Sequence, residues 1–226
     1  MKIIKQKSGF DIDKCDFSEE THPKHSVLFP SNLRGIIVGP SNSGKTNVMI
    51  SLLENENGLK FENVYVYSRS LFQPKYCYLE KLLKPIKGIN YNAFSASDNI
   101  VEPSKAKPNS VFIFDDVACD NQNIMREYFS MGRHKNIDSF YLCQTYAKIP
   151  KHLIRDNANM LVLFKQDDLN LKHIHQDHIG SDMSFESFKN VCFQCWKNTY
   201  DFVSIFTENP INQGRYRQNF DKYIYL

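Results

Sequence analysis

Residues 39–46 read Gly-Pro-Ser-Asn-Ser-Gly-Lys-Thr, which has the G-x-x-x-x-G-K-T spacing of a phosphate-binding loop. Gly39 lets the chain turn out of a strand, and Gly44 lets backbone N–H groups approach phosphate oxygens closely. Lys45 adds a positive charge for the β- and γ-phosphates, and the Thr46 hydroxyl can bind Mg²⁺. We therefore expect MgATP to bind this segment, and the residues expected to contact it are Gly39, Pro40, Ser41, Asn42, Ser43, Gly44, Lys45 and Thr46.

Two adjacent acids follow a second apolar run, Ser110-Val-Phe-Ile-Phe-Asp-Asp-Val117. Such a run predicts a buried strand, and carboxylates at its end can bind a metal ion and direct water at a phosphate. We expect Asp115 to be a Mg²⁺ ligand and Asp116 to orient the attacking water. The alternative is a strand that ends in a solvated acidic turn.

Three further polar residues fit phosphoryl transfer. Gln144 ends the apolar run 139–143, where an amide can hydrogen-bond the γ-phosphate or the attacking water; the alternative is a residue that caps the strand. Arg133 is a candidate arginine finger, which would stabilise transition-state charge in the site of a neighbouring subunit, and Arg155 is a second candidate. A surface arginine that is merely solvated is the alternative for each.

Apolar strands that alternate with helical patterns position these residues, which predicts an α/β fold with a mainly parallel central sheet and helices on both faces. Residues 1–30 are predicted to be an N-terminal extension and residues 31–226 a single P-loop ATPase domain. The segment 84–110 is predicted to be a long loop. The predicted strands are 35–38, 63–68, 111–114, 139–143, 160–164 and 200–206, and the predicted helices are 46–53, 78–83, 121–131, a short one after Pro150, and one or two within 167–196.

The composition excludes several classes of protein. The chain has 226 residues with 42% hydrophobic and 23% charged, which fits a globular protein and excludes an extended disordered chain. A formal net charge of +3 excludes a uniformly basic coat for nucleic acid. The six scattered cysteines and the lack of a long apolar run predict a protein of a reducing compartment without a membrane span.

Taken together, these motifs resemble the poxvirus-type DNA-packaging ATPases of the FtsK–HerA superfamily. The resemblance rests on Gly39–Thr46, Phe114-Asp115-Asp116, Gly132-Arg133-His134, the strand that ends at Gln144, and the segments 149–157 and 177–185, and it spans about residues 29–225. It implies an additional-strand P-loop fold in which the Gln144 strand lies between the P-loop strand and the Asp115 strand.

The resemblance also implies a function. It implies a homo-oligomeric ring, a hexamer, that uses ATP and Mg²⁺ to move double-stranded DNA into a capsid without reading its sequence. A capsid or portal component would be a partner, and the place of action would be the host cytoplasm, a viral factory or the virion. Relatives in the wider superfamily often have Glu where this chain has Asp116, whose side chain is one methylene shorter.

Two other functions remain open on the sequence alone. A small P-loop kinase that phosphorylates a nucleoside fits the length and the early P-loop, but no Arg-rich lid is evident. A non-catalytic, nucleotide-gated assembly scaffold is the second alternative.

The C-terminal third holds two weaker patterns. Cys192 and Cys195 form C-x-x-C after a cluster of histidines at 173, 175 and 178, which permits a zinc site; the favoured interpretation is a core helix that also buries Phe188. Arg215-Tyr-Arg217 could contact DNA or lie in a solvated tail.

Overall fold

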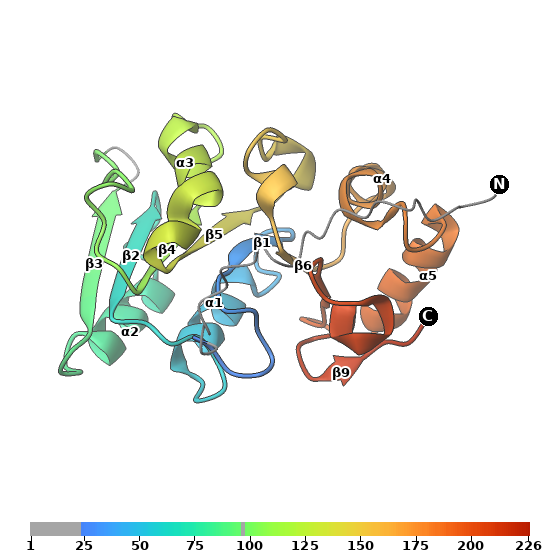
Figure 1. The fold of residues 1–226 in the computed structure, drawn as a ribbon, viewed down its shortest axis with the longest axis horizontal. Coiled ribbons are helices and arrows are strands. Elements are labelled where there is room, and N and C mark those ends of the chain that lie inside the picture. Colours follow the sequence, from blue (N-terminus) through green and yellow to red (C-terminus); the bar gives the residue numbers. More distant parts are fainter. Residues whose placement is uncertain (1–23, 96–97) are drawn as a thin grey trace, which may run out of the picture.

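The computed structural model describes residues 24–95 and 98–226 (Figure 1). They form one nine-stranded sheet in the order β3-β2-β4-β5-β1-β6-β7-β8-β9. The strands are β1 (Arg34–Val38), β2 (Asn63–Ser68), β3 (Asn90–Ser95), β4 (Ser110–Asp115), β5 (Ile137–Cys143), β6 (Met160–Leu163), β7 (Val203–Phe206), β8 (Tyr216–Gln218) and β9 (Lys222–Tyr223).

The sheet is mainly parallel, as predicted. Strands β3, β2, β4, β5, β1 and β6 pair in parallel, whereas β7, β8 and β9 add an antiparallel edge. Strand β5 lies between β1 and β4, which confirms the inserted-strand order that the family resemblance implied. The carboxyl ends of these three strands therefore lie at one edge of the sheet.

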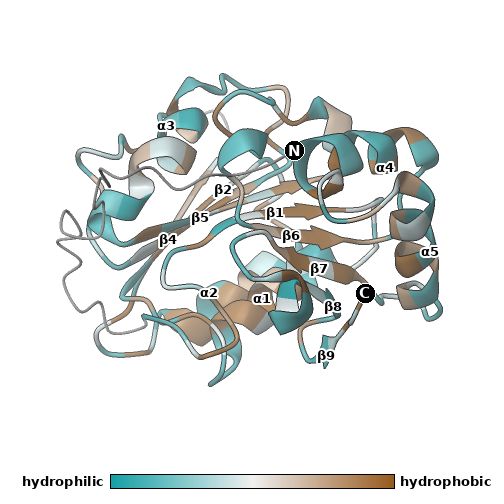
Figure 2. Cartoon of the chain, turned by 45° about the vertical axis from the view of Figure 1, so that its right-hand side comes forward, coloured by the Kyte–Doolittle hydropathy of each residue, from teal (hydrophilic) through white to brown (hydrophobic). Residues whose placement is uncertain are grey.

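Helices cover both faces of the sheet, which is also as predicted. Helices α1 (Lys45–Glu54) and α2 (Pro74–Leu83) pack on one face, and the other is covered by α3 (Asn123–Met131), α4 (Asp168–Ile174) and α5 (Phe185–Cys195). The central strands are the most hydrophobic part of the chain, and polar residues lie mainly on the outer elements (Figure 2). Burial of these strands on both faces explains their nearly continuous apolar sequences.

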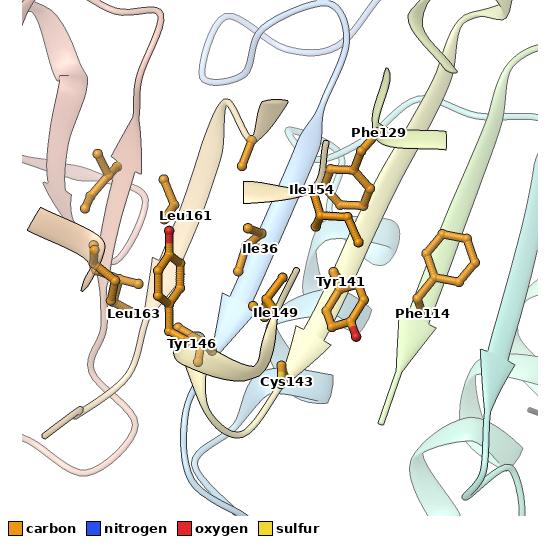
Figure 3. Packing of buried hydrophobic residues seen from close by; sticks show 14 of the residues in the cluster. Ile36, Phe114, Phe129, Tyr141, Cys143, Tyr146, Ile149, Ile154, Leu161 and Leu163 are labelled. Atoms are coloured by element: carbon orange, nitrogen blue, oxygen red, sulfur yellow. The ribbon is translucent and has the colours of Figure 1, made fainter. Parts of the chain in front are cut away.

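The segment after β5 closes the core on the face that carries α3 (Figure 3). Tyr146, Ile149 and Ile154 are fully or almost fully buried and pack in the same cluster as Ile36 and Leu161. A 3₁₀ helix at Arg155–Asn157 is the short helix predicted after Pro150.

The predicted N-terminal extension is described only from residue 24; its first 23 residues, Cys15 among them, lie outside the described part of the chain. The Lys24 ammonium lies 2.7 Å from the buried carboxylate of Asp138, and the His25 ring lies 3.1 Å from the same oxygen. Phe29 packs against Phe206 of β7 with ring centroids 5.9 Å apart. The last residues of the expected extension are therefore part of the packed structure.

The prediction of a structureless loop over 84–110 was wrong, because the loop contains β3. This strand lies at the edge of the sheet, and its side chains are only half-buried or exposed, so the sequence shows no apolar run there. Helix α2 begins at Pro74, earlier than predicted, and the tail expected to be polar forms β8 and β9. In the described residues no helix is both long enough and apolar enough to cross a membrane.

Candidate nucleotide-binding site

The P-loop runs from the end of β1 into α1, in the strand–loop–helix context that the motif requires. A Cβ on Gly39 would lie 2.6 Å from both Cβ of Phe164 and Oγ of Ser43, so only glycine fits there. Gly44 has a φ of 110°, in the left-handed region that favours glycine, and it directly precedes the first residue of α1. The two glycines are thus required by close packing and by backbone conformation, respectively.

The Lys45 side chain folds back over the P-loop. Its ammonium donates hydrogen bonds to the carbonyl oxygens of Gly39 at 2.7 Å and Pro40 at 2.8 Å. Burial lowers the pKa of Lys45, and the nearby Asp115 carboxylate opposes that shift. This places the cation at the wall of the cavity that the P-loop borders, which suits a charge that neutralises phosphate oxygens.

The two acids leave β4 in different environments. Asp115 is half-buried and accepts a hydrogen bond from the hydroxyl of Tyr76, a buried residue of α2. Burial raises the pKa of Asp115, and the bond from Tyr76 and the charge of Lys45 oppose the rise. Asp116 is exposed and has a φ of 58°, a left-handed backbone that turns its side chain out of the strand alternation.

Strand register brings the predicted catalytic groups together. Val38, the last residue of β1, pairs with Cys143 in β5, so Gly39 and Gln144 leave the sheet side by side. Asp115 pairs with Leu142, the neighbour of Cys143, on the other side of β5. The P-loop, Gln144 and the acids consequently lie at the same edge of the sheet.

A polar cavity of about 110 Å³ lies among these groups. Lys45, Thr46, Asp115, Asp116 and Gln144 all line it, together with the P-loop residues Ser41–Gly44. The Thr46 hydroxyl and the two carboxylates are hard oxygen donors on one cavity, which is the donor set that Mg²⁺ prefers. The residues present therefore fit Mg²⁺.

Three cavity residues were not identified from the sequence. Ser70, Gln73 and Lys75 come from the connection between β2 and α2 and its first helical turn. Strand β2 is the neighbour of β4, so the residues after it face the same edge as the acids. The signal available in the sequence was the strand 63–68 followed by Pro74, a residue common in the first turn of a helix.

The two candidate arginine fingers lie in different surroundings. Arg133 is exposed in a 3₁₀ turn, Gly132–Lys135, just before β5 begins, so it lies at the edge of the sheet opposite to Gln144. Six residue steps along β5 separate those edges by about 20 Å. Arg155 is buried instead: its Nη1 lies 2.9 Å from the Asp177 carboxylate, and its guanidinium stacks 5.0 Å from the centre of the Tyr146 ring.

The favoured interpretation of the two cysteines as core residues is confirmed. Cys192 and Cys195 are buried on α5 beside Phe188, and burial raises the pKa of both thiols. In residues 24–95 and 98–226 no three His, Cys, Asp or Glu side chains come together in a way that could hold a metal ion.

The expectation that Arg215 and Arg217 lie in a solvated tail was wrong, because both guanidinium groups are bonded within the fold. Arg217 is 2% exposed, and its guanidinium lies 4.1 Å from the centre of the Phe206 ring while donating to the carbonyl oxygen of Leu28 at 3.0 Å. Arg215 forms an ion pair with Asp182 at 2.5 Å. Both side chains fasten the C-terminal strands to the rest of the fold.

Comparison with known proteins gives a family and a fold. The structure is similar to that of the genome packaging NTPase B204 from Sulfolobus turreted icosahedral virus 2 in complex with sulfate, with a TM-score of 0.54 at 14% identity over 78% of this chain and 92% of that chain. The same NTPase in complex with ATP-gammaS gives a TM-score of 0.53 at 13% identity over 78% and 92%. B204, the DNA-packaging ATPase from Sulfolobus turreted icosahedral virus, gives 0.52 at 14% identity over 78% and 94%.

These identities show a shared fold. No curated protein matches the chain. The sequence model of the Poxvirus A32 protein family matches residues 20–187, which is well over half of the chain and includes the P-loop, both acids and Gln144. The chain therefore belongs to the Poxvirus A32 protein family.

Proposed function

We propose that this protein is the ATP-driven motor that moves double-stranded viral DNA into a capsid. Family membership supports this proposal, as does the shared fold with B204, which is described as a genome packaging NTPase and as a DNA-packaging ATPase. The motor would act as a ring of identical subunits, a hexamer, docked on a capsid or portal component. It would work where viral genomes are packaged, in the host cytoplasm, a viral factory or the virion.

One observation carries the ATPase part of the proposal. Lys45, Thr46, Asp115, Asp116 and Gln144 come from three different strand ends and line a single polar cavity. Phosphoryl transfer is catalysed almost entirely by positioning and by electrostatic stabilisation, and these side chains supply both.

Each residue has a distinct role in this scheme. The P-loop backbone and Lys45 hold the β- and γ-phosphates, and Asp116 and Gln144 orient the water that attacks the γ-phosphate. Thr46 and Asp115 would hold Mg²⁺, which would supply positive charge to offset the charge on the scissile phosphate. The Tyr76 hydroxyl keeps the Asp115 carboxylate pointed at the cavity.

Arg133 completes the site from a neighbouring subunit in this proposal. It is exposed and lies across the sheet from its own cavity, so its guanidinium is free to face another chain. Arg155 is not used, because its charge is paired with Asp177 in the interior. A finger supplied by the next subunit makes hydrolysis depend on assembly.

The test of the function is phosphate release from MgATP by the full chain, with and without double-stranded DNA and with the oligomeric state measured in the same samples. We expect hydrolysis that DNA stimulates, with Lys45→Ala inactive and Lys87→Ala, an exposed lysine far from the P-loop, unchanged. Phosphorylation of an added nucleoside would replace the motor with a kinase. If the unmodified chain hydrolysed ATP no faster than Lys45→Ala, the protein would be a non-catalytic, nucleotide-gated scaffold.

The role of Arg133 is tested by mixing subunits. Arg133→Ala subunits retain Lys45 and Lys45→Ala subunits retain Arg133, so mixed rings contain complete interfaces and should regain part of the activity. The matched control mixes Arg133→Ala with a chain that carries both substitutions, where no complete interface forms. Equal activity in both mixtures would place the finger elsewhere.

A further inference from the structure

The flank of the P-loop away from the acids is hollowed. One hollow of about 370 Å³ is bordered by the P-loop residues Pro40–Ser43, by Phe164 and Lys165 after β6, and by residues 196–201 between α5 and β7. A second, of about 160 Å³, is bordered by Gly44 and the first turn of α1 together with Phe164 and Phe202. Tyr200 and Phe164 line both hollows, so they form the ridge between them.

Tyr200 stands beside the P-loop in an unusual conformation. The residue is 64% exposed, and its φ of 76° is in the left-handed region that a bulky residue rarely adopts. A Cβ on Gly44 would lie 3.5 Å from Cδ1 of Tyr200, so the aromatic ring lies alongside the P-loop backbone. A left-handed backbone at a non-glycine residue persists only when its surroundings enforce it.

Hydrogen bonds hold the turn that presents Tyr200. The Asn198 amide donates to the Asp201 carboxylate at 2.8 Å, and the amide of Asn219, next to β8, donates to the same carboxylate at 3.2 Å. The following residue, Phe202, is buried against Phe164 with ring centroids 5.4 Å apart. The turn is thus fixed on both sides of an aromatic ring that is left open to solvent.

The strand order indicates which part of a bound nucleotide would lie near the Tyr200 ring. Strands β4 and β5 carry the acids and Gln144 on one side of β1, whereas β6 and β7 lie on the other side. A nucleoside triphosphate whose γ-phosphate faces Asp115 and Gln144 extends its nucleoside away from them, past Gly44 and toward Tyr200. The larger hollow shares Ser41, Asn42 and Ser43 with the phosphate cavity, so both lie against the same stretch of the P-loop.

We propose that Tyr200 stacks on the nucleobase of the nucleotide that the P-loop binds, an inference that rests on the proposed function. The contact uses the face of the tyrosine ring, and the Asn198 and Asp201 side chains of the same turn are bonded to each other. Every base has a π-face, so stacking of this kind discriminates weakly among bases. The stacking contact by itself therefore gives little preference between adenine and guanine.

The test compares ATP with inorganic tripolyphosphate, which has the phosphates and no base. Calorimetric titration of the full chain in Mg²⁺ uses Tyr200→Gly, because glycine adopts a φ of 76° without strain and the fold is retained. We expect ATP to bind about 10-fold more weakly, as alanine substitution of stacking aromatics indicates, and tripolyphosphate to bind as before. Tyr200→Phe should restore ATP affinity, and Tyr225→Ala, which removes another exposed tyrosine, should change neither ligand.

Several outcomes would overturn the inference. Unchanged ATP affinity in Tyr200→Gly, or equal losses for ATP and tripolyphosphate, would show that the ring does not contact the base. A preference above about 100-fold between ATP and GTP in the unmodified chain would show edge recognition, in place of stacking that tolerates any base. If the unmodified chain bound neither ATP nor tripolyphosphate, the proposed function would fail and the base contact with it.

Discussion

The buried ion pair between Arg155 and Asp177 makes a quantitative prediction about what each residue does. The side chains are 10% and 7% exposed, and the pair is closed by the Tyr146 hydroxyl, which donates to the same Asp177 oxygen at 3.0 Å. Lys151 reaches the other oxygen at 3.3 Å from the exposed side. Asp177→Asn leaves the guanidinium buried with no carboxylate beside it.

The size of the effect follows from this environment. Removing one partner of a buried pair costs about 3–5 kcal/mol, and the low end applies because an asparagine oxygen still accepts from Tyr146. A loss of about 3 kcal/mol lowers the melting temperature by roughly 6–12 °C in a domain of this size. Arg155→Met should be destabilising as well, since Asp177 then loses its main partner.

The assay measures the thermal unfolding of each variant and, well below its melting temperature, its rate of ATP hydrolysis per folded molecule. We expect both substitutions to lower the melting temperature and to leave hydrolysis near that of the unmodified chain. The exposed Arg133→Ala serves as the opposite control, with an unchanged melting temperature and lost hydrolysis. A shift in melting temperature of less than about 2 °C is smaller than the shift expected for 1 kcal/mol. If Arg155→Met showed so small a shift and also lost hydrolysis, the reasoning would be refuted and Arg155 would be the arginine finger.

Three further predictions concern single side chains. Tyr76→Phe removes the hydrogen-bond donor to Asp115 and should weaken Mg²⁺-dependent ATP binding about 10-fold, because a hydrogen bond to a charged group contributes about 1.5 kcal/mol at the low end. Titration calorimetry at several Mg²⁺ concentrations measures this affinity. An unchanged affinity contradicts the prediction. Lys75→Ala takes a cation from the cavity wall and should lower kcat/KM for ATP several-fold, whereas Lys81→Ala on the same helix should not. Burial lowers the pKa of His178 to about 4, whereas a histidine in an unfolded chain has a pKa of about 6.5. Between these two pH values the unfolded state binds a proton that the folded state does not bind. The free energy of unfolding therefore falls as the pH drops from about 6.5 to about 4, by up to about 3 kcal/mol. Urea unfolding from pH 7 to 4.5 should show that fall, and His178→Gln should flatten it.

The residues of the candidate site that follow strands could be predicted from the sequence. Lys45, Asp115 and Gln144 each follow an apolar run, and such runs identify the buried strands whose ends form the cavity. The order of the strands came from the resemblance to a family, because a run of apolar residues does not say which strand is its neighbour. Lys75 was missed for that reason: its relevance depends on β2 lying beside β4.

The errors concern residues whose surroundings are set by distant parts of the chain. Arg217 has the sequence context of a polar tail, but Phe206, Tyr223 and the carbonyl of Leu28 bury it. Arg155 likewise finds Asp177 only after the chain has folded back through α4. An edge strand such as β3 needs no fully apolar run, so its pattern cannot be told from that of a loop.

The position of Trp196 has a practical consequence. It is the sole tryptophan of the chain, its indole N–H donates to the carbonyl oxygen of Leu163 at 2.8 Å, and it borders the larger hollow together with Tyr200. Indole emission depends on the polarity and mobility of its surroundings, so a base that enters this hollow changes the fluorescence of a single, known residue. If the base stacks on Tyr200 as proposed, Trp196 emission would report nucleotide arrival and release, and each step could be followed without attaching a dye.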